Sequence, residues 1–211
     1  MSFRVSNVEA FRQWRDDEES DLDALLSKLN GTFQPSPSML AGTAFHRALE
    51  ESKTGDEADT LTALGHTFLI RADINLHIPD IREVRADKTY VVDGQQIRIS
   101  GQLDTISGKR VDDHKTTGRF DPERFMSGYQ WRLYLDIFGA DVFRWNVFEM
   151  SPVEADDMPA NTWEVFAFHS LTQYRYPGLP ADCQRLVDDF ARFVRAYLPL
   201  NKARDTAPVA A

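Results

Sequence analysis

Two carboxylates and a lysine stand close together near the middle of the chain, within the segment GQLDTISGKRVDDHKTT over 101–117. A Ser-Gly turn dipeptide divides this segment, so the sequence predicts a β-hairpin with one strand on each side of the turn. Side chains two residues apart in a strand share a face, which places Asp113 and Lys115 together. Asp104 lies on the neighbouring strand, where its side chain can converge with that of Asp113.

Carboxylates and an ammonium group at one spot are the groups that hold a hard divalent cation and stabilise a phosphate. The same residues on an exposed strand face would equally be ordinary solvated side chains, because a single Asp-x-Lys pattern is common. The hairpin alone leaves both interpretations open, and other parts of the chain must supply the rest of such a site.

The composition limits the classes of protein to which the chain can belong. Its 211 residues suit one domain with a sizeable core. The net charge of −9 argues against a protein that coats nucleic acid by bulk attraction, so a nucleic-acid enzyme would need a local basic surface. The single cysteine, Cys183, excludes a disulfide framework and a cysteine-based zinc or iron–sulfur site. We see no apolar segment long enough for a membrane and no secretory signal, and we expect a cytoplasmic protein.

Apolar spacing predicts two helices in the first quarter of the chain. The first is expected over 8–29, with the acidic run 16–19 as a solvated face. The second is expected over 39–52, with Ser38 as its N-cap. The small residues Ala41, Gly42 and Ala44 would let this second helix approach a sheet closely, and His46 shares a face with Glu50 one turn later.

Strand and turn signals dominate the middle of the chain. We expect a charged loop over 53–59, a helix or a strand over 61–72, and a strand over 81–86. A hairpin over 88–100 turns at Asp93-Gly94 and continues into the first hairpin, which gives an antiparallel meander of at least three strands.

The second half of the chain predicts a mixture of helices and strands. A helix over 121–138 begins at Asp-Pro-Glu and carries Gln130 and Tyr134 on one face. The remaining expected elements are strands over 141–149 and 163–171, a closing helix over 181–198 and a flexible tail over 201–211.

Four short motifs therefore follow one another along the chain. They are Gly42…His46, Gly101…Asp104, Asp113-His114-Lys115-Thr116 and Gln130…Tyr134. Each motif is weak alone, but their common order and spacing resemble the RecB-type branch of the PD-(D/E)XK nuclease superfamily, which includes phage exonucleases. The resemblance covers roughly residues 36–149.

The resemblance implies an α/β (α+β) fold with a restriction-endonuclease-like core, in which a central mixed β-sheet is flanked by helices. It implies one nuclease domain over 1–200, with 1–35 as an N-terminal helical extension. Several relatives in this branch carry a four-cysteine iron–sulfur cluster, so this chain would be the cluster-free form.

The resemblance also implies roles for individual residues. Asp104 and Asp113 match the metal-binding and catalytic carboxylates, and the backbone carbonyl of His114 would be a further ligand. Lys115 matches the lysine that orients or activates the attacking water, and His46 matches the helix histidine that adds a metal ligand. The implied cofactor is Mg²⁺ or Mn²⁺, since such cations prefer oxygen ligands.

A second group of residues would bind the substrate. Gln130 and Tyr134 match the pair that lines the site and contacts DNA. Arg119, Arg124 and Arg132 flank the site in sequence and, with Lys115, are expected to contact phosphates. Glu50 and Glu83 are candidate extra acids without an assigned role.

One departure from the family pattern concerns packing. Asp112 and His114 stand where this strand usually carries apolar residues, on the face opposite Asp113 and Lys115. Either that face is partly open to solvent, or these two side chains find polar partners.

The leading interpretation is a metal-dependent deoxyribonuclease that hydrolyses phosphodiester bonds, as an exonuclease of phage recombination or repair. Its partners would be DNA, a single-strand annealing or binding protein, and further copies of itself, in the host cytoplasm if a phage encodes it. A structure-selective or restriction-like endonuclease is the alternative enzyme. An inactive DNA- or protein-binding module and a plain acidic interaction protein are the non-enzyme alternatives, and cleavage polarity, strand preference and the number of metals stay open.

Overall fold

The computed structural model describes residues 1–52, 59–72, 74 and 82–198. Its strands are β1 (Ser2–Arg4), β2 (Thr60–Ala63), β3 (His66–Ile70), β4 (Arg82–Val92), β5 (Gln95–Ser107), β6 (Arg110–Thr117), β7 (Val142–Pro152) and β8 (Thr162–Tyr174). Its helices are α1 (Val5–Asp16), α2 (Leu22–Asn30), α3 (Pro37–Glu51), α4 (Pro122–Met126), α5 (Gln130–Phe138) and α6 (Leu179–Tyr197).

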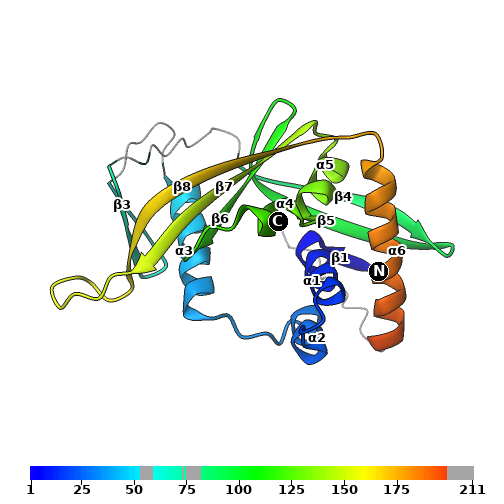
Figure 1. The fold of residues 1–211 in the computed structure, drawn as a ribbon, viewed down its shortest axis with the longest axis horizontal. Helices are drawn as coiled ribbons and strands as arrows, with labels where there is room; N and C mark the ends of the chain where they lie inside the picture. The colour runs from blue at the N-terminus through cyan, green and yellow to red at the C-terminus, as the bar shows by residue number, and fades with distance from the viewer. Residues whose placement is uncertain (53–58, 73, 75–81, 199–211) are drawn as a thin grey trace, which may run out of the picture.

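One mixed eight-stranded sheet forms the centre of the fold and is flanked by helices, which confirms the predicted class (Figure 1). The strand order is β1-β5-β6-β7-β8-β3-β2, and β4 pairs with the other edge of β5. β6 and β7 run parallel, whereas β7 and β8 form a long antiparallel pair. Within the described residues, no helix is long and apolar enough to cross a membrane.

The predicted meander is present as β4, β5 and β6. Asp93 and Gly94 have φ values of 49° and 77°, as a type I′ hairpin turn between β4 and β5 requires. The next turn lies at 108–109, one residue later than expected, and β6 continues to Thr117. The local turn signals therefore position the two strands that carry the candidate carboxylates.

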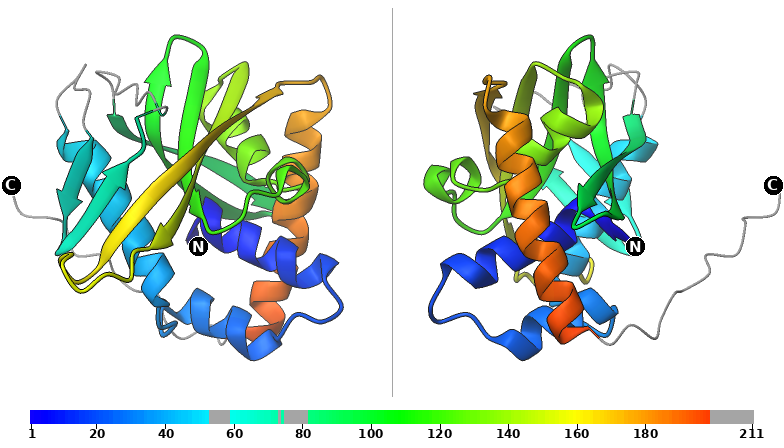
Figure 2. Two further views of the ribbon diagram at one scale, coloured as in Figure 1. Left: turned by 60° about the vertical axis from the view of Figure 1, so that its left-hand side comes forward. Right: turned by 90° about the vertical axis from the view of Figure 1, so that its right-hand side faces the viewer.

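The helices cover both faces of the sheet. On β7, Phe148 contacts Phe45 of α3, with 4.9 Å between ring centroids. Phe143 lies on the opposite face of the same strand and stacks with Tyr134 of α5 at 5.9 Å. Two separate hydrophobic clusters result, one beneath α3 and one formed with α1, α5 and α6. Figure 2 shows α3 well apart from α6.

The N-terminal region contains two helices where the sequence predicts one over 8–29. The acidic run does not continue the helix, because α1 ends at Asp16 and Asp17 is extended. Asp17 and Asp21 accept hydrogen bonds from backbone N–H groups two residues later, which favours a turn over a helix. α1 also contributes buried residues to the larger cluster, so the segment expected to be an extension is part of the core.

The predicted helix over 121–138 is also two helices, α4 and α5. The side chain of Glu9 from α1 accepts a hydrogen bond from Tyr129 N at 2.8 Å, between the two helices. Arg132 donates to the carbonyl of Gly128 at 2.6 Å. These side chains satisfy backbone groups that a continuous helix would pair internally, so the break depends on tertiary contacts.

Smaller differences concern element ends. α3 begins at Pro37 and is capped by Ser36, not Ser38, because Ser36 Oγ accepts from Met39 N. The ambiguous stretch 61–72 contains the hairpin of β2 and β3, which turns at Leu64 and Gly65. β1 has three residues, too few for a periodic signal, and was not expected.

Several expectations fall wholly or partly on residues that the structure does not describe. They are the charged loop at 53–58, the first residue of the strand expected over 81–86, and the tail over 201–211. The rest of that strand is present as part of β4.

Asp136 of α5 ties the helix to β4 and generates a stability prediction. Its carboxylate accepts from the Tyr90 hydroxyl at 2.7 Å and from Lys88 at 2.8 Å, and its side chain is only 1% exposed. We expect Asp136→Ala to lower the free energy of unfolding by about 2–3 kcal/mol, since it leaves a buried hydroxyl without its acceptor. Urea denaturation measures this change.

The double variant Asp136→Ala with Tyr90→Phe is the matched control. Removing both partners of a buried hydrogen bond costs less than removing one, so the double variant should recover part of the loss. A single variant within about 0.5 kcal/mol of the wild type would contradict this role of Asp136.

Candidate active site

The candidate site lies where β5 and β6 separate. One edge of β5 pairs with β1 at Arg98–Ser100 and with β6 at Thr105–Ser107. Residues 101–104 lie between these two pairings and, among the residues that the structure describes, have no strand partner on that edge. β6 continues alongside β7 instead, so a fork opens between Asp104 on one strand and Asp113 on the other.

Tyr134 of α5 occupies this fork. Its hydroxyl donates to the carbonyl of Gln102 at 3.0 Å, which satisfies an acceptor that the missing strand leaves free. A Cβ atom on Gly101 would lie 2.6 Å from the Tyr134 ring. The glycine of one motif is therefore required by the tyrosine of another.

Gly42 has the same function on the other face of the sheet. A Cβ atom at this position would lie 2.7 Å from Thr116 Oγ1 on β6. The absence of a side chain lets α3 approach β6, as the small residues of this helix predict. This close approach brings His46, one turn later on α3, to the fork.

Asp104 is held on both sides within the fork. Its Oδ2 accepts from the backbone N–H of His114 at 2.5 Å, and its Oδ1 lies 3.3 Å from His46 Nδ1. Burial alone would raise the pKa of Asp104, but the hydrogen bond with His46 and the nearby positive charge lower that pKa below its usual range. Asp104 is therefore an ionised carboxylate at neutral pH.

Asp113 forms an ion pair with Lys115 on the same face of β6, and its Oδ1 accepts from Gln130 Nε2 at 3.3 Å. Burial raises the pKa of Asp113 to about 6, against the opposing effect of the Lys115 charge, and Asp104 adds to the rise. Burial disfavours the Lys115 ammonium, but the two carboxylates outweigh this and raise its pKa. Lys115 contacts Asp113, and Asp104 lies near enough to influence the pKa values of both.

Gln130 and Tyr134 line the α5 side of this cluster, and their side chains are 3.5 Å apart. Burial and the nearby Asp113 raise the pKa of Tyr134 well above its usual value, so its hydroxyl stays a neutral donor. The Lys115 ammonium also lies 5.5 Å from the centre of the Trp145 ring. An aromatic face beside an ammonium stabilises the cation and excludes water from one side of it.

Of the two extra acids, Glu83 lies within electrostatic reach of both Asp104 and Glu50. Glu83 has a positive φ of 56° and accepts a hydrogen bond from Gln102. Burial raises the pKa of Glu83, and the negative charges of Asp104 and Glu50 add to this effect. Glu50 pairs with Arg47 at 2.9 Å on the exposed side of α3.

The residues at the fork fit a hard divalent cation by their chemistry. Asp113 Oδ2 is buried and accepts no well-aligned hydrogen bond within the described residues, although the Lys115 ammonium lies beside it. Two carboxylates, one backbone carbonyl and one imidazole form an oxygen-rich donor set that suits Mg²⁺ or Mn²⁺. Within the described chain, no three Asp, Glu, His or Cys side chains form a ready-made cation cage. In the fork, Asp104 faces His46 and the His114 N–H, and Asp113 faces Lys115 and Gln130.

Asp112 and His114 do find polar partners on the opposite face. Asp112 accepts from Arg110 at 3.0 Å and from Arg144 at 2.5 Å. His114 Nδ1 lies 3.3 Å from the Asn146 amide, and burial lowers the pKa of His114 to about 4. His114 is therefore a neutral imidazole at pH 7, and the second of the two alternatives raised by the sequence is correct.

The three candidate phosphate-binding arginines differ in their surroundings. Arg119 and Arg124 are exposed, and no ion pair involves either of them within the described residues. Arg132 donates to the carbonyls of Ser127 and Gly128 and packs on two aromatic rings. Arg132 therefore serves the junction between α4 and α5, and its contacts do not support the expected phosphate role.

Three residues on the Lys115 face of the sheet belong to none of the four motifs and were not predicted. Glu149 and His169 form a pair at 2.8 Å between β7 and β8, and Trp145 lies against Lys115. Polar and apolar residues alternate along the strands that carry them, and this alternation could have placed each residue on a face of the sheet. Their mutual proximity depends on the strand register, which no local pattern specifies.

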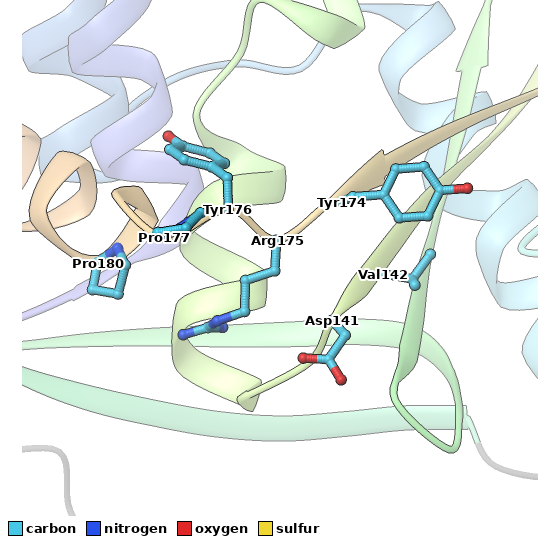
Figure 3. Close-up of a pocket in the computed structure, with 7 residues that line it drawn as sticks. All are labelled: Asp141, Val142, Tyr174, Arg175, Tyr176, Pro177 and Pro180. Carbon is cyan, nitrogen blue, oxygen red and sulfur yellow. The ribbon is translucent and has the colours of Figure 1, made fainter.

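A shallow hollow lies at the far end of β7 and β8 and is lined by Asp141, Val142, Tyr174, Arg175, Tyr176, Pro177 and Pro180 (Figure 3). Arg175 there donates to the carbonyls of Leu135 and Ala140 at 2.7 and 3.2 Å. A cation at the C-terminal end of α5 stabilises that helix end. The hollow contains none of the residues of the fork, so it is a separate feature.

Comparison with known proteins gives structural likenesses at low sequence identity. No protein-family model matches the chain, and no curated protein matches it in sequence. The crystal structure of SSO0001 matches with a TM-score of 0.50 and 17% identity, over 91% of this chain and 76% of that one. This likeness shows the fold.

Two further likenesses are to LHK-Exo, an alkaline exonuclease from Laribacter hongkongensis. Its structure matches with a TM-score of 0.46 and 15% identity, over 92% of this chain and 88% of that one. The complex of LHK-Exo with dAMP matches with a TM-score of 0.44 and 14% identity, over 92% and 87% of the two chains. At these TM-scores and identities, the function must be argued from the residues of the fork.

Gly101→Ala tests the contact between two motifs. The added methyl group must displace the Tyr134 ring, so we expect a loss of about 1–3 kcal/mol in the free energy of unfolding. Gly118→Ala is the matched control, because a Cβ atom there has nothing within 4 Å. Equal stabilities of the two variants in urea denaturation would show that Tyr134 does not require the glycine.

The raised pKa of Asp113 can be measured directly by carboxyl ¹³C titration of the metal-free protein. We expect the Asp113 resonance, identified by its absence in Asp113→Asn, to titrate near pH 6. Lys115→Ala removes the charge that favours the carboxylate, so the transition should move to higher pH. A transition near the ordinary value of about 4 in the wild type would contradict the burial of this carboxylate.

Proposed function

We propose that the protein is a metal-dependent DNA nuclease that hydrolyses phosphodiester bonds. The observation that carries this proposal is the convergence of Asp104 and Asp113 at the fork, with Lys115 paired to Asp113. The four motifs that resemble PD-(D/E)XK nucleases meet at this one place. Buried ion pairs occur elsewhere in this fold, as at Asp136 and Lys88, but the pair of Asp113 and Lys115 lies near a second carboxylate, Asp104.

The residues of the fork divide the work of hydrolysis. Mg²⁺ or Mn²⁺, held by Asp104, Asp113, His46 and the His114 carbonyl, would lower the pKa of a bound water and polarise the phosphoryl oxygen. Lys115 remains charged because of its carboxylate neighbours, and it can orient that water and offset charge on the attacked phosphate. Gln130 fixes the orientation of Asp113 through its amide.

Within the nuclease class, we propose an exonuclease that acts on DNA ends during recombination or repair. The support for this finer assignment is the resemblance of the motifs to the branch that includes phage exonucleases. A partner that binds or anneals the resulting single strand, and a ring of several copies, belong to the same proposal. Arg119 and Arg124 are the exposed cations that we assign to DNA phosphates in an otherwise acidic chain.

The proposal predicts metal-dependent cleavage of end-labelled linear DNA. We expect cleavage with Mg²⁺ or Mn²⁺, none with EDTA, and a loss of at least about 100-fold in Asp104→Asn, Asp113→Asn and Lys115→Ala. Asp141→Asn is the matched control for the two Asp→Asn variants, and Lys28→Ala is the matched control for Lys115→Ala. Both controls make the same charge change at an exposed position outside the fork. Release of mononucleotides from linear DNA with circular DNA left intact would identify an exonuclease.

Other outcomes would separate the alternatives. Cleavage of circular DNA would identify an endonuclease. A folded protein that binds DNA but neither cleaves it nor binds Mn²⁺ in calorimetry would be the non-catalytic binding module. Cleavage that persists in Lys115→Ala and Asp113→Asn would contradict the assigned site.

A further inference from the structure

The loop that follows β6 folds back over the sheet and is held there by two side chains. The backbone N–H of Phe120 donates to Glu149 Oε1 at 2.7 Å. The other carboxylate oxygen, Oε2, is bonded to His169 Nε2 at 2.8 Å. The Phe120 ring stacks on the His169 ring at 3.9 Å between centroids with an interplanar angle of 1°. We call Glu149 and His169 the clamp.

The clamp lies on the same face of the sheet as Lys115. Lys115 is the register partner of Val147 on β7, and Val147 is the partner of His169 on β8. Register partners in adjacent strands share a face and are separated by about 4.8 Å per strand. His169 is therefore two strands away from the lysine of the fork, in the same cross-strand row.

Aromatic rings connect the clamped loop to Lys115. Phe120 stacks with Phe125 of α4 at 6.1 Å, and Phe125 contacts Trp145 at 5.7 Å. The Lys115 ammonium lies over this same Trp145 ring. The loop and α4 thus form a packed wall beside the lysine, and the clamp anchors the outer end of this wall.

Arg119 is the exposed cation of this loop, in which Gly118 and Asp121 are also exposed. It lies directly before Phe120, and its backbone is fixed further by Thr117 Oγ1, which donates to Arg119 O at 2.8 Å. Three residues lie between it and Lys115, so the two Cα atoms are at most about 14 Å apart. An arginine held at this distance can contact a phosphate next to the one that Lys115 faces.

We propose that Glu149 and His169 are positioning residues that hold residues 118–121, so that Arg119 contacts a substrate phosphate beside Lys115. This inference rests on the proposed nuclease function for its substrate, but the clamp itself does not. The hydrogen bond from His169 lowers the pKa of Glu149, which keeps the acceptor of the Phe120 N–H ionised. Disruption of the clamp should release Arg119 without removing it.

Limited proteolysis tests the clamp without any substrate. Trypsin cleaves after arginine, and the clamp holds the N–H of the Arg119–Phe120 bond. We expect His169→Ala to speed cleavage after Arg119 at least about tenfold, because the opened loop becomes accessible. Glu149→Ala removes the acceptor of the Phe120 N–H and should speed this cleavage as well. An unchanged rate in His169→Ala would overturn the clamp.

DNA binding in EDTA tests the role of Arg119, because no metal is present to support cleavage. We expect Arg119→Ala to make the slope of log K against log salt less negative by about 0.9, the value for one duplex phosphate. His169→Ala should produce the same change, and the double variant should add nothing further. Lys28→Ala, at an exposed position of α2 outside the fork, is the control for a lost positive surface charge.

The outcomes separate this inference from the proposed function. The positioning role would be overturned if the slope of log K against log salt were unchanged in His169→Ala. It would also be overturned if the double variant changed the slope by the sum of the two single changes, even if the protein is a nuclease. Absence of DNA binding in the wild type would overturn the proposed function and the phosphate contact together, while the proteolysis result alone would still decide the clamp. In the active enzyme, His169→Ala should raise KM about tenfold and leave kcat nearly unchanged, whereas partial unfolding would lower kcat.

Discussion

The separation of β5 from β6 beyond the pair Thr105–Asp112 is the constraint on which the rest of the site depends. A sheet that stayed paired would place Asp104 and Asp113 on a continuous ladder with no room for a third group between them. The fork frees the edge of β5 for the Tyr134 hydroxyl and frees the Asp104 carboxylate for the His114 N–H. Both motif glycines serve this arrangement, since each admits a side chain from another element.

Charge balance is the second organising feature. The fork buries carboxylates in a chain with a net charge of −9, and each one has a partner that limits the cost of burial. Asp113 is paired with Lys115, and Asp104 is bonded to His46 and to a backbone N–H. A divalent cation would replace these internal partners in neutralising the carboxylates, which frees the lysine and histidine for new roles. The same groups can thus stabilise the metal-free protein and form its reactive centre.

Turn dipeptides and alternating side chains are local signals, and they predicted the meander of β4, β5 and β6. The fold class followed from the resemblance of the four motifs to a nuclease superfamily. Gly42 and Gly101 were recognised as motif positions from the sequence. A side chain at either position would clash with Thr116 or Tyr134, and these contacts exist only in the folded chain.

The sequence predicted one helix in two places where the structure has two helices. In both places side chains bind backbone groups at the break, as Glu9 does at the N–H of Tyr129. Arg132 was expected to bind a phosphate because it is near the site in sequence. In the structure its guanidinium donates to the backbone carbonyl of Gly128. The clamp of Glu149 and His169 depends on the register of β7 and β8, which periodicity does not determine.

The most direct measurement is a crystal structure of the protein soaked in Mn²⁺, with anomalous diffraction used to locate the cation. The account predicts one strong anomalous peak in the fork, within coordination distance of carboxylate oxygens of both Asp104 and Asp113. It also predicts that the Lys115 ammonium no longer contacts Asp113 Oδ2 in that state. A peak bound by only one of the two carboxylates, or no peak in the fork at a concentration that saturates the protein, would contradict the central claim.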